Sequence, residues 1–125
     1  MPFTCPACSV SRSLTIDATL ELPPDSRSDE IAVQLIHCSR CDFTGIAVYE
    51  ESRRGSLDSE SVDHYGYSVS AAELDDIREL IRFCPAPRKP RCNCAAHRQL
   101  GARNASGRWS GLREIRRRNS FPIRR

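Results

Sequence analysis

The sequence lacks a long apolar run, and it lacks the local patterns of several enzyme classes. No hydrophobic stretch approaches the roughly 20 residues of a membrane-spanning helix, so we expect no membrane span. The first residues, MPFTCPAC, show neither a charged n-region nor an apolar h-region, so we expect no secretory signal and a cytoplasmic location. A glycine-rich phosphate loop and the His-x-Glu…Pro-Cys-x-x-Cys deaminase pattern are also absent, and no small-molecule substrate is indicated. We therefore do not expect an enzyme.

Cysteine, in contrast, is abundant. The chain has 7 cysteines among 125 residues, and in a reducing compartment such cysteines are typical of metal ligands rather than disulfides. Their odd number does not divide into pairs either. With 39% hydrophobic residues the core is small, and bound metal ions are a common means of stabilising a small domain.

Alternating apolar residues predict a small antiparallel sheet. The segment SLTIDATLEL alternates strictly, which predicts a half-buried strand with one apolar face formed by Leu14, Ile16, Ala18, Leu20 and Leu22. Further strands are predicted at 30–37, where Ile31, Val33 and Leu35 share a face, at 46–51 and, as a short strand, at 65–69. Polar, turn-rich segments at 23–29 and 52–63 are expected to be loops.

A single amphipathic helix is predicted after residue 70. Ser70 and Glu73 have the spacing of a capping box, and Pro85 ends the helix. An apolar stripe at helical spacing consists of Leu74, Ile77, Leu80 and Ile81. Cys84 follows Ile81 by three residues, so we expect its thiol to point into the protein.

Two Cys-x-x-Cys motifs predict a first metal site. Two residues between cysteines let both thiolates face one cation, so Cys5, Cys8, Cys38 and Cys41 complete a tetrahedral sulfur site of the kind that zinc favours. The predicted strands between the motifs form a hairpin that brings them together. The alternative is a pair of redox dithiols, but a redox Cys-x-x-Cys usually lies at a helix N-terminus after a strand, and neither motif has that context.

The segments CPAC and CSRCDFTG, joined by this hairpin, resemble the zinc-ribbon superfamily over residues 3–50. The resemblance implies a structural zinc ion bound by the four cysteines on a small antiparallel sheet. Ribbon motifs often have glycine after the second cysteine, whereas this chain has Ser9 and Asp42 there. The superfamily includes modules of very different function, so the resemblance implies no activity.

The segment CPAPRKPRCNCAAH predicts a second metal site. The three remaining cysteines and one histidine, Cys84, Cys92, Cys94 and His97, make up a tetrahedral set of three thiolates and one imidazole. His97 lies one helical turn after Cys94, so both can face one ion. Alternatively, Cys84 is an ordinary buried thiol, Cys92 and Cys94 are free, and His97 is solvated. His37, beside the second motif, is a further candidate to replace a ligand.

Charge is divided unevenly along the chain. Residues 1–84 contain 7 Lys/Arg and 15 Asp/Glu, a net charge of −8, whereas residues 85–125 contain 12 Lys/Arg and one acid, a net charge of +11. Residues 98–125 have little apolar periodicity, so we expect them to form a basic, flexible tail. Arginine binds phosphate through two parallel hydrogen bonds, and aromatic residues stack on unpaired bases. The candidate nucleic-acid-binding residues are Arg108, Trp109, Arg113, Arg116, Arg117, Arg118, Arg124 and Arg125.

These patterns together predict an α+β fold. We expect a zinc-ribbon-like domain at 1–97, with an antiparallel sheet of three to four strands followed by one helix and a second Cys/His metal clip, and then the basic tail at 98–125. Two Zn2+ ions per chain are expected. The leading functional hypothesis is a nucleic-acid-binding module that uses its tail. The alternatives are a protein-interaction scaffold with an apolar patch around Tyr49, Tyr65 and Tyr67, and a small enzyme.

Overall fold

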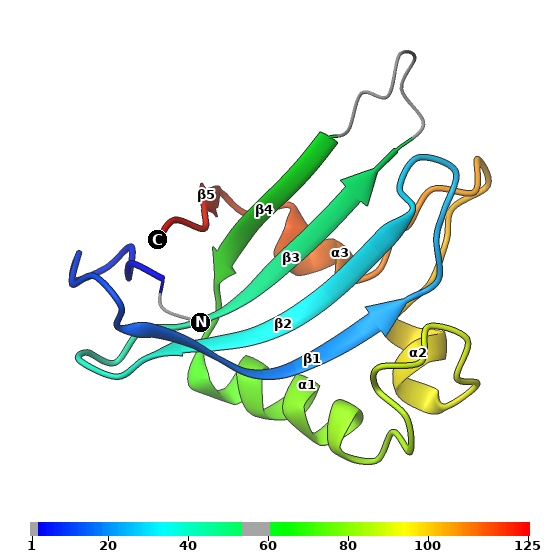
Figure 1. Cartoon of the computed structure of the whole chain (residues 1–125). Coiled ribbons are helices and arrows are strands. Elements are labelled where there is room, and N and C mark those ends of the chain that lie inside the picture. Colours follow the sequence, from blue (N-terminus) through cyan, green and yellow to red (C-terminus); the bar gives the residue numbers. More distant parts are fainter. Residues whose placement is uncertain (1–2, 54–60) are drawn as a thin grey trace.

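The computed structural model describes residues 3–53 and 61–125, and these form an α+β fold built on one antiparallel sheet. The five strands follow one another across the sheet in sequence order (Figure 1). The elements are β1 (Leu14–Leu22), β2 (Glu30–Cys38), β3 (Thr44–Ser52), β4 (Ser61–Ser68), α1 (Ala71–Arg82), α2 (Ala95–Leu100), α3 (Arg113–Arg116) and β5 (Ser120–Pro122).

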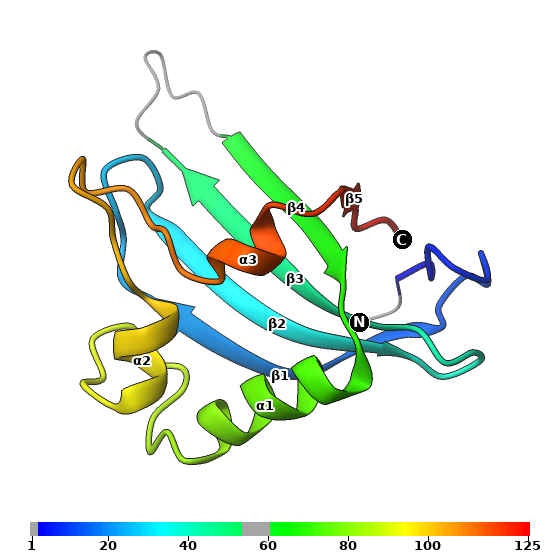
Figure 2. The same ribbon diagram turned by 180° about the vertical axis from the view of Figure 1, so that it is seen from behind.

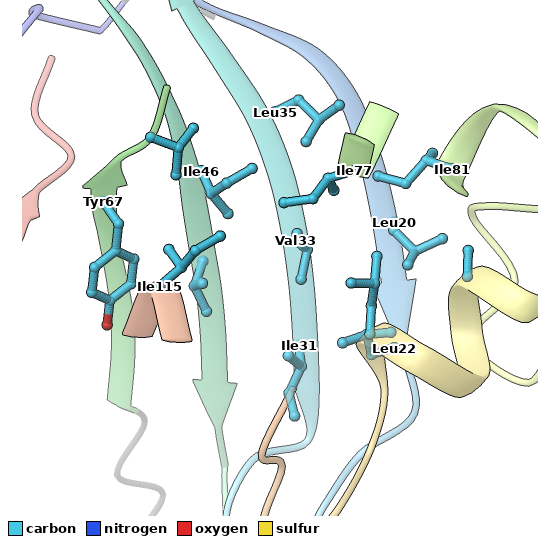
Figure 3. Close-up of a cluster of buried hydrophobic side chains, with 14 of the residues drawn as sticks. Leu20, Leu22, Ile31, Val33, Leu35, Ile46, Tyr67, Ile77, Ile81 and Ile115 are labelled. Carbon is cyan, nitrogen blue, oxygen red and sulfur yellow. The ribbon is translucent and has the colours of Figure 1, made fainter. Parts of the chain in front are cut away.

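The three helices cover one face of the sheet and leave most of the other face open (Figures 1 and 2). The main core lies between the sheet and the helices, where Val33 and Ile46 face Ile77 of α1 and Ile115 of α3 (Figure 3). A second, smaller cluster lies on the opposite face, near the two Cys-x-x-Cys motifs. It includes Phe3, Cys5, Leu14, Ile36, Cys38 and Ala47. No helix among the described residues is long and apolar enough to cross a membrane.

A β-bulge at Asp17 divides β1 between these two cores. Ile16 pairs with Ile36, but Ala18 pairs with Leu35, so one residue of β1 is left over. The extra residue reverses the faces. Leu14 and Ile16 therefore contact the smaller cluster, whereas Ala18, Leu20 and Leu22 contact the main core. The prediction that all five residues share one face is wrong, although the expected strand is present.

The predicted helix is confirmed as α1, including its cap. The Ser70 hydroxyl accepts from the Glu73 N–H, and the Glu73 carboxylate accepts from the Ser70 N–H. Leu74, Ile77 and Ile81 are buried against the sheet, and Cys84 is only 8% exposed. The expected inward direction of the Cys84 thiol is therefore also confirmed.

The C-terminal segment contradicts the prediction of a flexible tail. Trp109 is 3% exposed and Ile115 is 7% exposed, and both belong to the main core. The segment ends in β5, which pairs with β4 and adds a fifth strand to the three or four expected. Finally, the Thr4 N–H donates to the Arg124 carbonyl at 2.7 Å, next to the first cysteine motif. Residues 98–125 therefore cross the helix side of the sheet and fold with it (Figure 2).

The predicted loop at 52–63 is shorter than expected. β3 extends to Ser52 and β4 begins at Ser61, so both strands reach into the predicted loop. The middle of this loop, residues 54–60, lies outside the described residues.

Candidate metal centres and the arginine surface

The first candidate metal centre is formed by two turns at the same end of the sheet. One turn precedes β1 and holds Cys5 and Cys8, while the other follows Cys38, the last residue of β2, and holds Cys41. The Cys5 and Cys41 Sγ atoms are 3.7 Å apart, as are those of Cys8 and Cys38, and all four sulfur atoms lie within 4.8 Å of one another. The predicted four-residue group is therefore assembled.

These distances fit a tetrahedral ion. Four sulfur ligands that each lie about 2.3 Å from one ion are separated from one another by about 3.8 Å. Backbone N–H groups also point at the sulfur atoms: Ala7 donates to Cys5 at 3.4 Å, and Arg40 donates to Cys38 at 3.3 Å. Such N–H contacts favour the thiolate, which is the form that binds metals.

The pKa values of two thiols in this centre diverge. Burial raises the pKa of Cys38, but contacts with the Ser13 hydroxyl and the Arg40 N–H lower it to about 6. For Cys41 the Phe43 N–H acts to lower the pKa, but burial and the neighbouring sulfur atoms raise it to about 12. Four thiolates this close repel one another unless a cation lies between them, so the arrangement suits a metal ion better than free thiols.

The residue after the first motif has the strained conformation that glycine usually adopts. Ser9 has φ 62°, in the left-handed region, and its N–H donates to the Cys5 carbonyl at 2.9 Å. Asp42, in the corresponding position of the second motif, is not among the residues with positive φ. Only the first motif therefore carries the cost of a side chain in this region.

The second candidate metal centre joins the end of α1 to the start of α2. The Cys84 and Cys92 Sγ atoms are 3.8 Å apart, and His97 Nδ1 lies 3.5 Å from Cys84 Sγ and 3.1 Å from Cys94 Sγ. All four ligand atoms lie within 4.8 Å of one another. The residues predicted to form a second centre are therefore brought together as well.

The imidazole of His97 is oriented for coordination through Nδ1. Its Nε2 donates to the Glu21 carbonyl of β1 at 2.9 Å, so the proton lies on Nε2 and Nδ1 is available as a ligand. This hydrogen bond also links the second centre to the sheet. Cys94 caps α2, because its sulfur accepts from the His97 N–H at 3.4 Å.

The thiols of the second centre repeat the pattern of the first. Burial raises the pKa of Cys84 to about 11. Burial also acts to raise the pKa of Cys94, but the His97 N–H and imidazole lower it to about 6. In each centre, therefore, the pKa of one thiol is lowered and the pKa of another is raised. Four protein ligands at a tetrahedral ion leave no open position for a substrate, which is typical of structural sites.

His37 belongs to neither centre. Its Nδ1 lies 2.8 Å from the Asp17 carboxylate and 3.2 Å from the Thr15 hydroxyl on β1. The possibility that it replaces a cysteine ligand is therefore not supported by the geometry.

Arg108, predicted to contact nucleic acid, instead lies in a partly buried ion cluster. Its guanidinium bonds the carboxylates of Asp25 and Glu50, the latter at 2.9 Å, and the side chains of these two acids are 0% and 5% exposed. Ser28 and Tyr65 donate hydroxyl hydrogen bonds to Glu50 at 3.1 and 2.8 Å. We call these five residues the Arg108 latch, because they hold the C-terminal segment against the loop before β2.

Asp25 is the most constrained acid of the latch. Burial acts to raise the pKa of Asp25, but N–H groups of Trp109, Ser28 and Arg27 and the Arg108 guanidinium together hold it well below its usual range. The Trp109 N–H donates to Asp25 at 2.7 Å. Sequence reasoning missed this acid, because its partners in the C-terminal segment lie more than 80 residues away.

Trp109 is buried and is not a platform for unpaired bases. Its indole N–H donates to the Leu100 carbonyl at 2.7 Å, and the Arg116 guanidinium lies 4.0 Å from its ring centroid. Both the burial and the covered ring contradict the predicted stacking role. The ring instead anchors the C-terminal segment in the main core.

The remaining predicted arginines divide between different parts of the surface. Arg118 forms an ion pair with Glu73 at the start of α1. Arg124 lies beside the first metal centre, and Arg125 lines a trough on the open face of the sheet. Arg113, Arg116 and Arg117 are the three that gather at one place.

These three arginines line a hollow of about 610 Å3, which we call the arginine hollow. Its six lining residues are Arg103, Asn104, Ser110, Arg113, Arg116 and Arg117. Arg103, Asn104 and Ser110 were not among the candidates from the sequence. A turn between them brings this segment beside α3, and no local sequence pattern indicates that arrangement. The turn-forming composition of NASG at 104–107 is the one signal that points to such a reversal.

Comparison with known protein families, with curated proteins and with solved structures gave no match to the chain.

Proposed function

We propose that both centres bind zinc and that their role is structural. The support comes from the ligands: four thiolates in one centre, and three thiolates with one imidazole in the other, are closed tetrahedral sets of the kind zinc forms. All seven cysteines are free thiols, as metal binding requires, and a reducing compartment such as the cytoplasm keeps them so. A set of four thiolates also suits iron, so metal analysis of purified protein decides between the two ions.

We further propose that the first centre, with β1 and β2, is a zinc-ribbon-like segment. The arrangement of motif, strand, strand and motif over residues 3–50 supports this assignment. In that case the zinc ion fixes the end of the sheet, and the remainder of the chain is an elaboration built on it.

The functional proposal is that this zinc-stabilised domain binds nucleic acid through the arginine hollow. The observation that carries it is the gathering of Arg103, Arg113, Arg116 and Arg117 around one concavity. Guanidinium groups bind phosphate oxygens through paired hydrogen bonds, and a cluster of them provides the electrostatic part of nucleic-acid affinity. Among residues 85–125 the one acid is Glu114, which does not line the hollow.

The folded position of these arginines changes the expected interface. Arg108 belongs to the partly buried latch and Arg118 is paired with Glu73, and neither of them lines the hollow. The interface is therefore a rigid patch near α3 rather than a mobile tail. A rigid patch loses less conformational entropy on binding than a disordered segment does.

Salt-dependent binding to a short oligonucleotide tests this proposal. One phosphate contact for each of the four arginines sets an upper limit of roughly −3 for the slope of log affinity against log salt with single strands. The Arg113→Ala/Arg117→Ala double variant removes two exposed guanidinium groups and is expected to reduce the slope by roughly 1.4. Arg124→Ala, which removes the same kind of charge from a residue that does not line the hollow, is the matched control. Binding that is unchanged in the double variant contradicts the proposal.

A protein-interaction scaffold is the second candidate, and one observation favours it. The open face of the sheet carries a trough of about 670 Å3, lined in part by Tyr49, Gln34 and His64. The apolar patch expected from three tyrosines does not form, because Tyr65 and Tyr67 pack against the main core on the other face. Filling the trough with Ala32→Trp separates the two candidates: it should disturb a protein partner and leave oligonucleotide binding unchanged.

A further inference from the structure

The chemistry of the arginine hollow is uniform in one respect. Each of the six residues that line it carries a hydrogen-bond donor in its side chain: four guanidinium groups, one amide and one hydroxyl. Neither a carboxylate nor an apolar side chain belongs to the lining. A concavity built in this way is complementary to an oxyanion with several free oxygen atoms.

The amide of Asn104 has its oxygen committed elsewhere. Asn104 Oδ1 accepts from the Ser106 N–H at 3.0 Å, from the Ser106 hydroxyl at 2.7 Å and from the Arg108 N–H at 3.1 Å. Three donors on one oxygen fix the orientation of the amide, so its NH2 group is the part left for a ligand. Asn104 therefore acts in the hollow as a donor only.

Two of the four guanidinium groups are held in place before any ligand arrives. Arg116 donates to the carbonyls of Trp109 and Gly111, each at 3.2 Å, and lies over the Trp109 ring. Arg103 donates to the Pro24 carbonyl. Because neutral carbonyls orient these groups, their positive charge is not neutralised. Arrangement before binding lowers the entropy lost when a ligand is bound.

The other two guanidinium groups are exposed and weakly engaged. Arg113 forms no ion pair within the described ranges 3–53 and 61–125. Arg117 lies 3.7 Å from Glu114, but these side chains are 61% and 85% exposed, so the pair is readily exchanged for a ligand. The hollow thus combines two fixed donors with two that can close over a bound group.

We propose that the arginine hollow binds the terminal phosphate of a nucleic-acid strand. This inference rests on the proposed nucleic-acid function and names the part of the strand that is recognised. A terminal phosphate monoester carries a charge of about −1.5 to −2 and three free oxygen atoms, whereas an internal diester has one negative charge and two such oxygens. Six donors around one concavity match the monoester better than the diester.

The shape of the site supports the same choice. An internal phosphate continues into the strand on both sides, so both continuations have to leave a concave site. A terminal phosphate has one continuation and can enter the hollow end-on. The volume of about 610 Å3 lies within the range of small-ligand pockets.

The test compares oligonucleotides of one sequence that end in a 5′-phosphate, a 3′-phosphate or hydroxyl groups only. Charge-assisted hydrogen bonds to the terminal phosphate are expected to make a phosphorylated strand bind about tenfold more tightly than a strand that ends in hydroxyl groups. Arg113→Ala and Arg117→Ala should each reduce this preference. Arg113→Lys should retain the charge but lose the paired hydrogen bonds, and so reduce the preference as well. Inorganic phosphate should compete with the phosphorylated strand.

The outcomes separate this inference from the function on which it rests. If wild-type protein binds phosphorylated and unphosphorylated strands equally, recognition of the end is wrong while nucleic-acid binding stands. A preference that survives in the Arg113→Ala/Arg117→Ala variant places recognition elsewhere and also overturns the inference. If none of the strands binds at low salt, both proposals fail. Arg124→Ala should retain both the affinity and the preference.

Discussion

Replacing Arg108 by methionine should destabilise the protein far more than the loss of any exposed arginine. The guanidinium lies between the carboxylates of Asp25 and Glu50, whose side chains are almost fully buried. Methionine retains much of the apolar volume of arginine but leaves two negative charges without a cation. Removing one partner from a buried ion pair costs roughly 3–5 kcal/mol.

The remaining hydrogen bonds place the expected loss near the lower end of that range. Asp25 still accepts from the backbone N–H groups of Arg27, Ser28 and Trp109 at 2.7–2.8 Å, and Glu50 still accepts from two hydroxyl groups. The Arg108 side chain itself is 22% exposed, so water screens part of its charge. We therefore expect a loss of about 3 kcal/mol in the free energy of unfolding.

Urea unfolding of the metal-loaded protein at pH 7 measures this loss. Trp109 is the only tryptophan and lies next to the latch, so its fluorescence reports the region directly. The folded-state pKa of Asp25 is depressed, so its contribution to stability is present above its unfolded pKa of about 3.8 and is lost as the pH falls through its folded value. At pH 7 the contribution is complete.

Two further variants identify the cause of the loss. Glu50→Gln removes one of the two charges, so Arg108→Met should cost about 1 kcal/mol less in that background than in the wild-type protein. Arg88→Met breaks an ion pair with Glu21 in which the arginine is 71% exposed, and it should cost less than about 1 kcal/mol. If Arg108→Met costs no more than Arg88→Met, the latch does not hold the C-terminal segment and the reasoning is refuted.

Four other perturbations have definite expected results. Purified protein should contain two zinc ions by metal analysis, and replacing Cys92 and Cys94 by serine should leave one. Cys38→Ser should unfold the sheet, because metal binding at a structural site contributes on the order of 10 kcal/mol to folding. A native-like circular dichroism spectrum of the Cys38→Ser variant would contradict this. Ser9→Gly should raise the free energy of unfolding by about 1 kcal/mol, since glycine adopts φ 62° without strain, and a lower midpoint in urea would count against the geometry of this turn. Ending the chain after Gly101 should abolish the dispersed NMR spectrum, because it removes Trp109 from the core. A retained spectrum would instead support the prediction that residues 98–125 form a flexible tail.

The parts of the fold that were predictable depend on neighbours in the chain. The helix cap depends only on Ser70 and Glu73, which lie three positions apart in the chain. The spacing within each cysteine motif likewise indicates which residues can reach one ion. The bulge at Asp17 was not predictable from β1, because its alternation is unbroken. The one indication lies in β2, where Leu35 and Ile36 are adjacent apolar residues that point to opposite faces of the sheet, and the structure buries both.

The C-terminal segment was mispredicted for a related reason. Its buried residues are few and widely spaced, so they produce no helical or strand periodicity. The contacts that fold it are made with distant residues: Arg108 bonds Asp25 across 83 positions, and Trp109 bonds the same carboxylate across 84. A composition rich in arginine indicates a solvated tail when read locally, and only the buried acids on the other side of the core change that interpretation.

The C-terminal segment spans the distance between the two metal centres, and this has a consequence for the order of events during synthesis. It leaves His97 at one centre and ends with Arg124 bonded to Thr4 beside the other. The chain emerges from the ribosome with its N-terminus first, so Cys5 and Cys41 can bind one ion long before Arg124 has been synthesised. Until β5 forms, the edge of β4 from Tyr65 to Tyr67 has no partner strand, and a nascent chain paused there exposes this edge to its neighbours. An ion bound at the first centre would then hold the ends of β1, β2 and β3 together while translation supplies the residues that complete the sheet.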